Sequence, residues 1–316
     1  MDLQAPSHYV LAIGAANVDI TGSSDHPLAA HDSTPGQVRT APGGVARNVA
    51  ENLARLGHAV RLVSVVGEDL QGASVLDSTR RAGVDVQGCQ VLSGQATATY
   101  LSLHGPDGDM ALALNDMAIL EHITPELLAC ELPRLRLATA VLVDCNLPQE
   151  TLGWIGAQAV GLPLFAESVS AFKCGRLLPW LEQVHTLKAN RLEARALTGQ
   201  PMESDEQVAA AARWLHQRGV RQVVLSLGEQ GLYWSHAQGA QGWQAAMTAP
   251  VVNATGAGDA LMAGLMHGHL MGQQLPDAVA FAAACAALTL TAPHANHPLL
   301  SVAAVQQLQR SQLSAT

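Results

Sequence analysis

The sequence has few basic residues and no cluster of them. Its 316 residues contain 17 lysines and arginines against 26 aspartates and glutamates, which gives a formal charge of −9, and no basic run exceeds two residues. A protein that binds nucleic acid or an anionic membrane needs a concentrated positive patch. We therefore expect neither partner, and expect a small-molecule substrate instead.

The sequence also lacks the patterns of a disulfide framework and of a zinc site. Its five cysteines are scattered without a Cys-x-x-Cys pair, so we expect free thiols in a reducing compartment. None of the 13 histidines belongs to a His-x-x-x-His pair with a carboxylate on a helix, so we expect surface or hydrogen-bonded core residues.

No segment has the pattern of a signal peptide or of a membrane span. The amino terminus has no cationic stretch before its short apolar run, and we expect a disordered lead into a strand. The alanine-rich segment 277–292 is too short and too weakly hydrophobic to cross a bilayer. These absences predict a cytoplasmic protein.

Short apolar segments alternate with helical segments along most of the chain. We expect strands at 9–15, 59–67, 138–145, 162–167, 184–188 and 221–228. We expect helices at 44–56, 70–82, 148–159, 190–197 and 204–218. The strands are apolar without polar alternation, which indicates burial on both faces and an α/β fold with a mostly parallel sheet between helices.

Two regions, at about 17–40 and 96–116, break this rhythm. They alternate or reverse as antiparallel strands do, with a Pro-Asp-Gly-Asp turn at 106–109. We expect a small inserted β-sheet that acts as a lid, within a single domain over 1–316, because no low-complexity linker or repeat divides the chain. Exposed strand edges of the lid would allow a homodimer.

The segment 253–259 reads Asn-Ala-Thr-Gly-Ala-Gly-Asp and leads into an apolar helical stretch. Its small residues expose backbone N–H groups at a helix N-terminus, which suits a phosphate. It is not a Walker P-loop, because it ends in Asp259 instead of Gly-Lys-Ser/Thr. Asp259 is either a general base for an attacking hydroxyl or a carboxylate that stabilises the helix dipole, and spacing alone does not decide.

Polar residues and glycines near the amino terminus form a second candidate site. Asn17 and Asp19 follow the first strand, where parallel sheets bind ligands, and could hold sugar hydroxyls or form a polar turn. Gly43 and Gly44 would let a ligand approach a helix that carries Asn48, or would merely form a turn. No complete dinucleotide fingerprint follows a strand, which argues against a nicotinamide dehydrogenase.

Two further motifs follow in the second half of the chain. Asn190 and Glu193 share a helix face and could organise hydrated Mg²⁺, but the spacing favours a capping box. Ser226, Gly228 and Gly231 lie at a strand end and a glycine turn, which could border a nucleotide or form a plain hairpin.

In this order, the segments resemble the ribokinase-like, or PfkB, family of carbohydrate and nucleoside kinases. Segments 43–57 and 255–259 resemble its two signatures, and 190–193 resembles its Asn-x-x-Glu motif. The resemblance covers nearly the whole chain and implies a doubly wound fold with a β lid, ATP as phosphoryl donor, and Mg²⁺. Six longer segments are similar to pseudouridine kinases, which implies transfer to the ribose 5′-hydroxyl of pseudouridine. The alternatives are another nucleoside or sugar as acceptor (uridine, adenosine or ribose), or a non-catalytic nucleoside-binding protein.

The resemblance also implies roles for the candidate residues. Asp259 would be the base, and the anion hole would consist of Gly256, Ala257 and Gly258. The ribose hydroxyls would be held by Asp19, Gly43, Gly44 and Asn48, with Asn17 beside them. Glu193 would hold Mg²⁺ through water. The nucleotide would be bordered by Asn190, Ser226, Gly228, Gly231 and Thr255. The remaining nucleoside contacts would be Asn115, Asp116, Asn146 and Lys173, the last assisting either the phosphates or the base.

Three segments depart from the family pattern. Asn253 and Ala254 replace the commoner Asp-Thr, which weakens the prediction of a monovalent-cation site in this loop. Glu167 and Ser168 replace Asp-Pro, and Ala189 replaces Pro. We expect these last departures to shape the backbone more than the chemistry.

Overall fold

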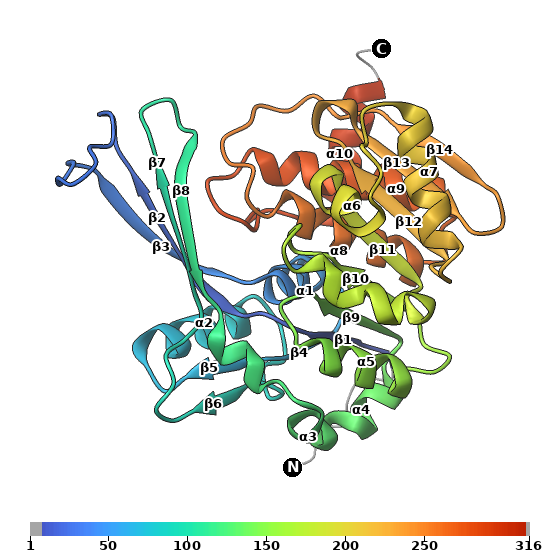
Figure 1. Cartoon of the computed structure of the whole chain (residues 1–316), viewed down its shortest axis with the longest axis horizontal. Helices are drawn as coiled ribbons and strands as arrows, with labels where there is room; N and C mark the ends of the chain where they lie inside the picture. Colours follow the sequence, from blue (N-terminus) through green and yellow to red (C-terminus); the bar gives the residue numbers. More distant parts are fainter. Residues whose placement is uncertain (1–7, 314–316) are drawn as a thin grey trace.

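The computed structural model describes residues 8–313 and is organised around one large sheet (Figure 1). The expected lead at residues 1–7 lies outside this part of the chain. The sheet has eight strands in the order β14-β13-β12-β11-β10-β9-β1-β4, parallel from β4 to β12, with β13 and β14 antiparallel at one edge. The strands are β1 Val10–Ile13, β4 Val60–Val63, β9 Ala140–Asp144, β10 Leu164–Glu167, β11 Thr186–Asn190, β12 Gln222–Ser226, β13 Leu232–His236 and β14 Gln241–Gln244.

Both faces of this sheet are buried under helices. Along β1, Leu11 and Ile13 pack into one hydrophobic cluster, whereas Val10 and Ala12 pack into another on the opposite face. The first cluster is covered by α5 (Gln149–Gln158), α6 (Arg191–Thr198) and α7 (Asp205–His216). The second is covered by α1 (Val45–Arg55), α2 (Leu70–Arg81) and α8 (Ala257–Leu270). This two-sided burial confirms the predicted doubly wound α/β fold.

The remaining helices complete the two layers. On the α8 side lie α9 (Leu275–Leu290) and α10 (Val302–Leu313). The short helices are α3 Pro125–Leu128, α4 Leu132–Leu137, η1 Ala118–His122, η2 Ala129–Glu131, η3 Cys174–Gln183 and η4 Gly228–Gln230. None of the helices that the structure describes is both long and apolar enough to cross a bilayer.

A four-stranded lid projects from the body (Figure 1). Its order is β3-β2-β7-β8, with β2 Asn17–Ser23, β3 Gln37–Gly43, β7 Thr99–His104 and β8 Met110–Asp116. Each of the two regions forms an antiparallel hairpin as predicted, and the central pair that joins them, β2 and β7, is parallel. Each of these two strands leaves the body in the same direction and returns through its own hairpin, so the hairpins join side by side.

The segment expected as one strand at 59–67 is divided. Its first part is β4, and its second part, β5 (Val65–Gly67), leaves the main sheet to pair with β6 (Gln90–Leu92). Ser64 lies at the division, and its hydroxyl donates to the carbonyl of Gly14 at 2.7 Å. This side-chain bond replaces the ladder bond that a continuous strand would make.

The lid has one polar face and one apolar face. Because cross-strand neighbours share a face, the register places Asp19, Tyr100 and Asn115 in one row on the same side. The next row, on the other side, contains Leu101 and Leu114. This second face is open to solvent, since several of its residues are more than half exposed: Val38, Leu112 and Leu114.

Candidate active site

Polar residues end four neighbouring strands at the carboxyl edge of the main sheet. Asp144, Glu167, Asn190 and Ser226 are the last residues of β9, β10, β11 and β12. The lid strand β2 follows β1 at the same edge after a short link. Ligands bind at this edge in open parallel sheets, so the candidate site lies where the lid joins the body.

The loop before α8 is built around two glycines that no other residue could replace without movement. Gly256 has φ +82°, and a Cβ there would lie 2.0 Å from the carbonyl oxygen of Ala295. A Cβ on Gly258 would lie 2.7 Å from Nζ of Lys188. No side chain of the described residues caps this helix. The N–H of Ala257 donates to the carbonyl oxygen of Ala254 over a long 3.5 Å, whereas the N–H groups of Gly258 and Asp259 are available to an anion.

Asp259 lies buried in the first turn of α8, with 8% of its surface exposed. Its Oδ2 accepts a hydrogen bond from Nδ2 of Asn48 at 2.7 Å, which joins α8 to α1. Burial, reinforced by the charge of Glu167, raises the pKa of Asp259 to about 8, although Asn48 and Lys188 oppose the rise. A carboxylate with a pKa near neutral is suited to accept a proton at physiological pH.

A buried ion pair that the sequence analysis missed lies beside this loop. Lys188 on β11 pairs with Glu167 on β10, and both side chains are almost fully buried. Burial lowers the pKa of Lys188, but Glu167, Glu193 and Asp259 outweigh burial and raise it, so the ammonium stays charged. The only sequence signal is a lysine inside an apolar strand.

Glu167 and Ser168, which we expected to shape the backbone more than the chemistry, also make side-chain contacts beside Asp259. Glu167 pairs with Lys188 and raises the pKa of Asp259. The hydroxyl of Ser168 donates to Oε2 of Glu193 at 2.7 Å. Oε2 of Glu167 also accepts from the N–H of Val169, whose φ of +65° is unusual for a β-branched residue.

Asn190 and Glu193 form the capping box that their spacing predicted. The side chain of Asn190 accepts from the N–H of Glu193, and Oε2 of Glu193 accepts from the N–H of Asn190. Burial, together with Glu167, raises the pKa of Glu193, while Lys188 lowers it. The cap brings this carboxylate to the ion pair, and its role toward Mg²⁺ stays a prediction.

On the lid side, the structure brings Asn17, Asp19 and Gly43 together. Asn17 and Asp19 belong to strand β2, so the alternative of a polar turn is wrong. Nδ2 of Asn17 donates to Oδ1 of Asp19 at 2.7 Å, and a Cβ on Gly43 would lie 2.3 Å from the same oxygen. Burial raises the pKa of Asp19, whereas Asn17 and Arg47 lower it.

Asp144 holds three segments together at the carboxyl edge of the sheet. It is fully buried, and its Oδ2 accepts from the N–H groups of Ala15 at 2.9 Å and Ala46 at 3.0 Å. Its Oδ1 accepts from the N–H of Asn146 at 2.9 Å. One carboxylate thus fixes the link after β1, the first turn of α1 and the turn after β9.

Lys173 contacts Asn146 and lies away from the loop before α8 in its hydrogen bonding. Its Nζ donates to Oδ1 of Asn146 at 2.7 Å. Burial lowers the pKa of Lys173, and the main opposing charge is Asp144. Lys188 is therefore the cation beside Asp259, whereas Lys173 lies with Asn146 and Asp144, and its contact with a substrate stays a prediction.

The lid residues named from the sequence separate onto two faces. Asn115 lies in the row of Asp19 and Tyr100. Asp116 lies on the other face, and its Oδ1 accepts from the N–H of Ala118 at 3.2 Å. Of Asn115 and Asp116, only Asn115 therefore shares the face of Asp19.

The glycine turn after β12 forms a hairpin, which is one of the two structures that its sequence allowed. Ser226 pairs with Leu232 across β12 and β13. Gly228 and Gly231 both have positive φ, and a Cβ on Gly231 would lie 2.1 Å from the carbonyl oxygen of Gln244. Packing against β14 therefore requires Gly231, and a contact with nucleotide stays a prediction for all three candidates.

The side chain of Asn253 shapes the loop before α8. Its Oδ1 accepts from the N–H of Thr255 at 2.9 Å, and its Nδ2 donates to the carbonyl oxygen of Pro293 at 3.1 Å. The exposed Thr255 is thereby held next to Gly256.

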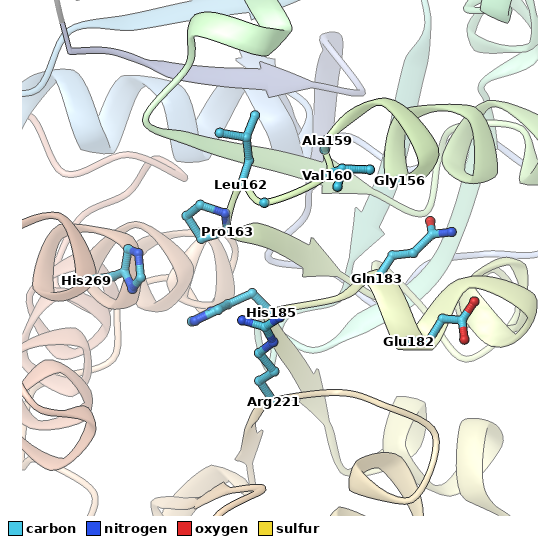
Figure 2. Close-up of a pocket in the computed structure, with 11 residues that line it drawn as sticks. Gly156, Ala159, Val160, Leu162, Pro163, Glu182, Gln183, His185, Arg221 and His269 are labelled. Carbon is cyan, nitrogen blue, oxygen red and sulfur yellow. The ribbon is translucent and has the colours of Figure 1, made fainter.

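A cavity of about 420 Å³ lies at the opposite end of the strands (Figure 2). Pro163, His185 and Arg221, which line it, precede β10, β11 and β12. Burial lowers the pKa of His185 to about 4, and burial also lowers the pKa of His269, so both imidazoles are neutral. Glu182 is the only carboxylate among the residues that line this cavity, and it is not one of those at the candidate site.

Comparisons with known proteins agree with this geometry. Residues 7–301 match the model of the pfkB family carbohydrate kinases. The chain is 43% identical to the pseudouridine kinase of Escherichia coli strain K12 over 300 residues, which is 95% of this chain and 96% of that protein.

Solved structures share the fold. The Arabidopsis thaliana ribokinase complexed with ribose and ATP superposes with a TM-score of 0.87 at 23% identity, over 96% of this chain and 98% of that one. An Escherichia coli protein assigned as a ribokinase II, in complex with ATP and Mg²⁺, gives 0.83 at 19% identity, over 96% and 99%. The chain therefore belongs to the pfkB family of carbohydrate kinases, and it is a kinase that phosphorylates a sugar hydroxyl.

Proposed function

We propose that this kinase transfers the γ-phosphoryl group of ATP to the ribose 5′-hydroxyl of pseudouridine. The observation that carries the proposal is the hydrogen bond between Asn48 and Asp259. It joins α1, which follows Gly43 and Gly44 and would contact the acceptor, to α8, whose N-terminus would bind the phosphates of the donor. The 43% identity to a pseudouridine kinase over almost the whole chain supports this acceptor over ribose or adenosine.

In the proposed reaction, Asp259 accepts the proton of the 5′-hydroxyl. Its Oδ2 is engaged by Asn48, so Oδ1 is the atom that faces the hydroxyl. The ribose oxygen forms a bond to the γ-phosphorus as the bond to the β,γ-bridging oxygen breaks, and ADP leaves. The N–H groups at 256–258 and the ammonium of Lys188 offset the negative charge on the phosphoryl oxygens.

The charges around Lys188 fit a divalent cation. Its ammonium interacts electrostatically with Glu167, Glu193 and Asp259, so carboxylates exceed cations around it once Asp259 is ionised. No three acidic, histidine or cysteine side chains of residues 8–313 form a direct ligand set. Glu193 would therefore hold Mg²⁺ through water while ATP supplies phosphate ligands, and the ion would add positive charge to the phosphates.

The polar face of the lid closes the acceptor side. Asp19, Asn17 and Gly43 would hold the ribose, and Asn115 would reach the nucleoside from the same face. Lys173 and Asn146 would contact the base, because their charges and hydrogen bonds are shared with Asp144 and not with the phosphate loop. A covered nucleoside keeps water away from ATP.

The loop before α8 has no requirement for a monovalent cation in this proposal. Nδ2 of Asn253 already donates to the carbonyl oxygen of Pro293. The amide at this position thus donates a hydrogen bond where the commoner aspartate would offer only oxygen acceptors to a cation. We expect activity that is independent of K⁺.

We propose that the chain forms a homodimer in which a second copy covers the apolar face of the lid. Val38, Leu112 and Leu114 are 73%, 63% and 68% exposed, and no element of the described chain packs on them. Two such faces, related by a twofold axis, would bury each other as packed sheets do.

An acceptor panel tests the proposed function. ATP turnover is measured with pseudouridine, uridine, adenosine and ribose, and the phosphorylated product is identified by mass spectrometry. We expect the highest kcat/KM with pseudouridine and almost no turnover without an acceptor. A higher kcat/KM with any other acceptor would reject pseudouridine as the substrate while leaving the kinase assignment intact.

A further inference from the structure

Arg47 is a buried arginine that lies one residue before Asn48 on α1. Only 2% of its surface is exposed. Its Nη1 donates to Oδ1 of Asn48 at 2.7 Å, to the carbonyl oxygen of Pro42 at 2.8 Å and to Oδ1 of Asn296 at 3.2 Å. Its Nη2 pairs with Glu51. The guanidinium is thus held on several sides in one position.

This position fixes which way the amide of Asn48 points. A guanidinium only donates hydrogen bonds, so the atom of Asn48 that contacts Arg47 must be its carbonyl oxygen. The amide nitrogen then points to the other side, where it donates to Oδ2 of Asp259. A reversed amide would place an oxygen against the carboxylate and remove this bond.

The contact continues toward the end of the chain. Nδ2 of Asn296 donates to the backbone carbonyl of Asn48 and to Oδ1 of Asn52, both at 2.9 Å. Asn296 follows Ala295, whose carbonyl lies against Gly256. The segment that holds Arg47 therefore also holds the loop that carries Asp259.

We infer that Arg47 is a positioning residue that, by orienting the amide of Asn48, holds the carboxylate of Asp259 with one oxygen free for the acceptor hydroxyl. This inference rests on the proposed role of Asp259 as the base. Arg47 itself touches neither substrate nor the reacting atoms. Its charge also acts on Asp19 and Asp259, and a lysine at this position would keep that charge, so the hydrogen-bonded path through Asn48 can be tested separately.

A double-mutant cycle tests this path. Arg47→Lys keeps the charge but loses the planar fork that reaches Asn48, Pro42 and Asn296 together. We expect it to lower kcat about 10- to 100-fold, with the KM for ATP changed less than about twofold, because coupled neighbours interact on this scale. In an Asn48→Ala background, the same substitution should lower kcat less than about twofold further, because the mediating amide is gone.

A matched control separates positioning from general stability. Arg61 is also a buried arginine, with 6% of its surface exposed, and it pairs with Glu131 and Asp85 on another part of the body. Arg61→Lys should lower the melting temperature about as much as Arg47→Lys does, while its kcat stays within about twofold of wild type. A loss of kcat in Arg61→Lys equal to that in Arg47→Lys would overturn the inference.

Two further results distinguish the inference from the proposed function. If Asp259→Asn keeps the wild-type kcat, the base assignment fails and the inference fails with it. If Asp259→Asn loses turnover but Arg47→Lys costs as much with Asn48→Ala as without it, only the inference fails. If Arg47→Lys does not fold, Thr79→Val replaces it: it removes the acceptor of Nε of Arg47 at 3.3 Å without removing a contact of Asn48 or of the loop before α8, and its smaller loss of kcat should also vanish in the Asn48→Ala background.

Discussion

Replacing Asp259 by asparagine should stabilise the folded protein while it removes activity. The pKa of Asp259 is raised from an ordinary value of 3.8 to about 8, chiefly by burial and Glu167. Between these values the unfolded chain ionises this carboxyl while the folded chain keeps it protonated. Wild-type stability therefore falls by about 1.4 kcal/mol for each pH unit in this range, relative to a variant with no carboxyl.

The expected difference in stability between Asp259→Asn and wild type can be measured as a difference in melting temperature. For a chain of this length, 1 kcal/mol corresponds to about 2 °C, so the advantage of Asp259→Asn should grow by about 3 °C per pH unit. It should begin near pH 4 and level off above pH 8. The measurement is differential scanning calorimetry or fluorimetry of both proteins, without nucleotide, at unit steps of pH.

The control for this experiment is Asp107→Asn. Asp107 lies exposed in the lid turn, and its Oδ1 accepts from the N–H of Asp109, which asparagine can also satisfy. Its effect on the melting temperature should be the same at every pH. An equally constant difference for Asp259→Asn would refute the reasoning, because the carboxyl would then ionise alike in both states.

Four other measurements test the site. In the wild type, kcat/KM should rise with pH to a plateau above about 8, since the base must be ionised; a profile flat from pH 6 to 9 would contradict this. Gly258→Ala keeps its backbone N–H but places a methyl group 2.7 Å from Nζ of Lys188, and displacement of this ammonium from the phosphoryl group should lower kcat about 10²- to 10³-fold with the fold intact by circular dichroism. Exchange of Na⁺ for K⁺ at constant ionic strength should leave kcat unchanged, because the amide of Asn253 donates a hydrogen bond where the commoner aspartate would offer only oxygen acceptors; strong stimulation would show otherwise. Light scattering should give the mass of a dimer for wild type and of a monomer for Leu112→Glu, and a monomeric wild type would reject the proposed assembly.

The fold could be predicted because its signal is local. Apolar strands without polar alternation indicate burial on both faces, and this is what β1 and its neighbours show. The parallel pairing of β2 with β7 could not be predicted, because strand direction depends on where distant hairpins leave the body. The pairing of β5 with β6 could not be predicted either, because the periodicity of an apolar segment does not show where the segment leaves one sheet for another.

The site could be predicted only in pieces. The loop that ends in Asp259 and the helix that carries Asn48 have local signatures, but the hydrogen bond between them spans 211 positions. Glu167 and Lys188 lie in adjacent strands and have no motif that links them. Their effect on the pKa of Asp259 comes from burial and mutual distance, which only the folded chain defines.

The contacts of Asn296 have a consequence for the order in which the chain folds during synthesis. Asn296 is separated by 248 positions from Asn48, and it joins α1 to the loop that leads into α8. Contacts of such long range form late, after the intervening chain has collapsed. A ribosome must therefore release almost the entire polypeptide before the base and its partner can meet. We expect a nascent chain that stops after α9 to contain most of the sheet and still lack turnover.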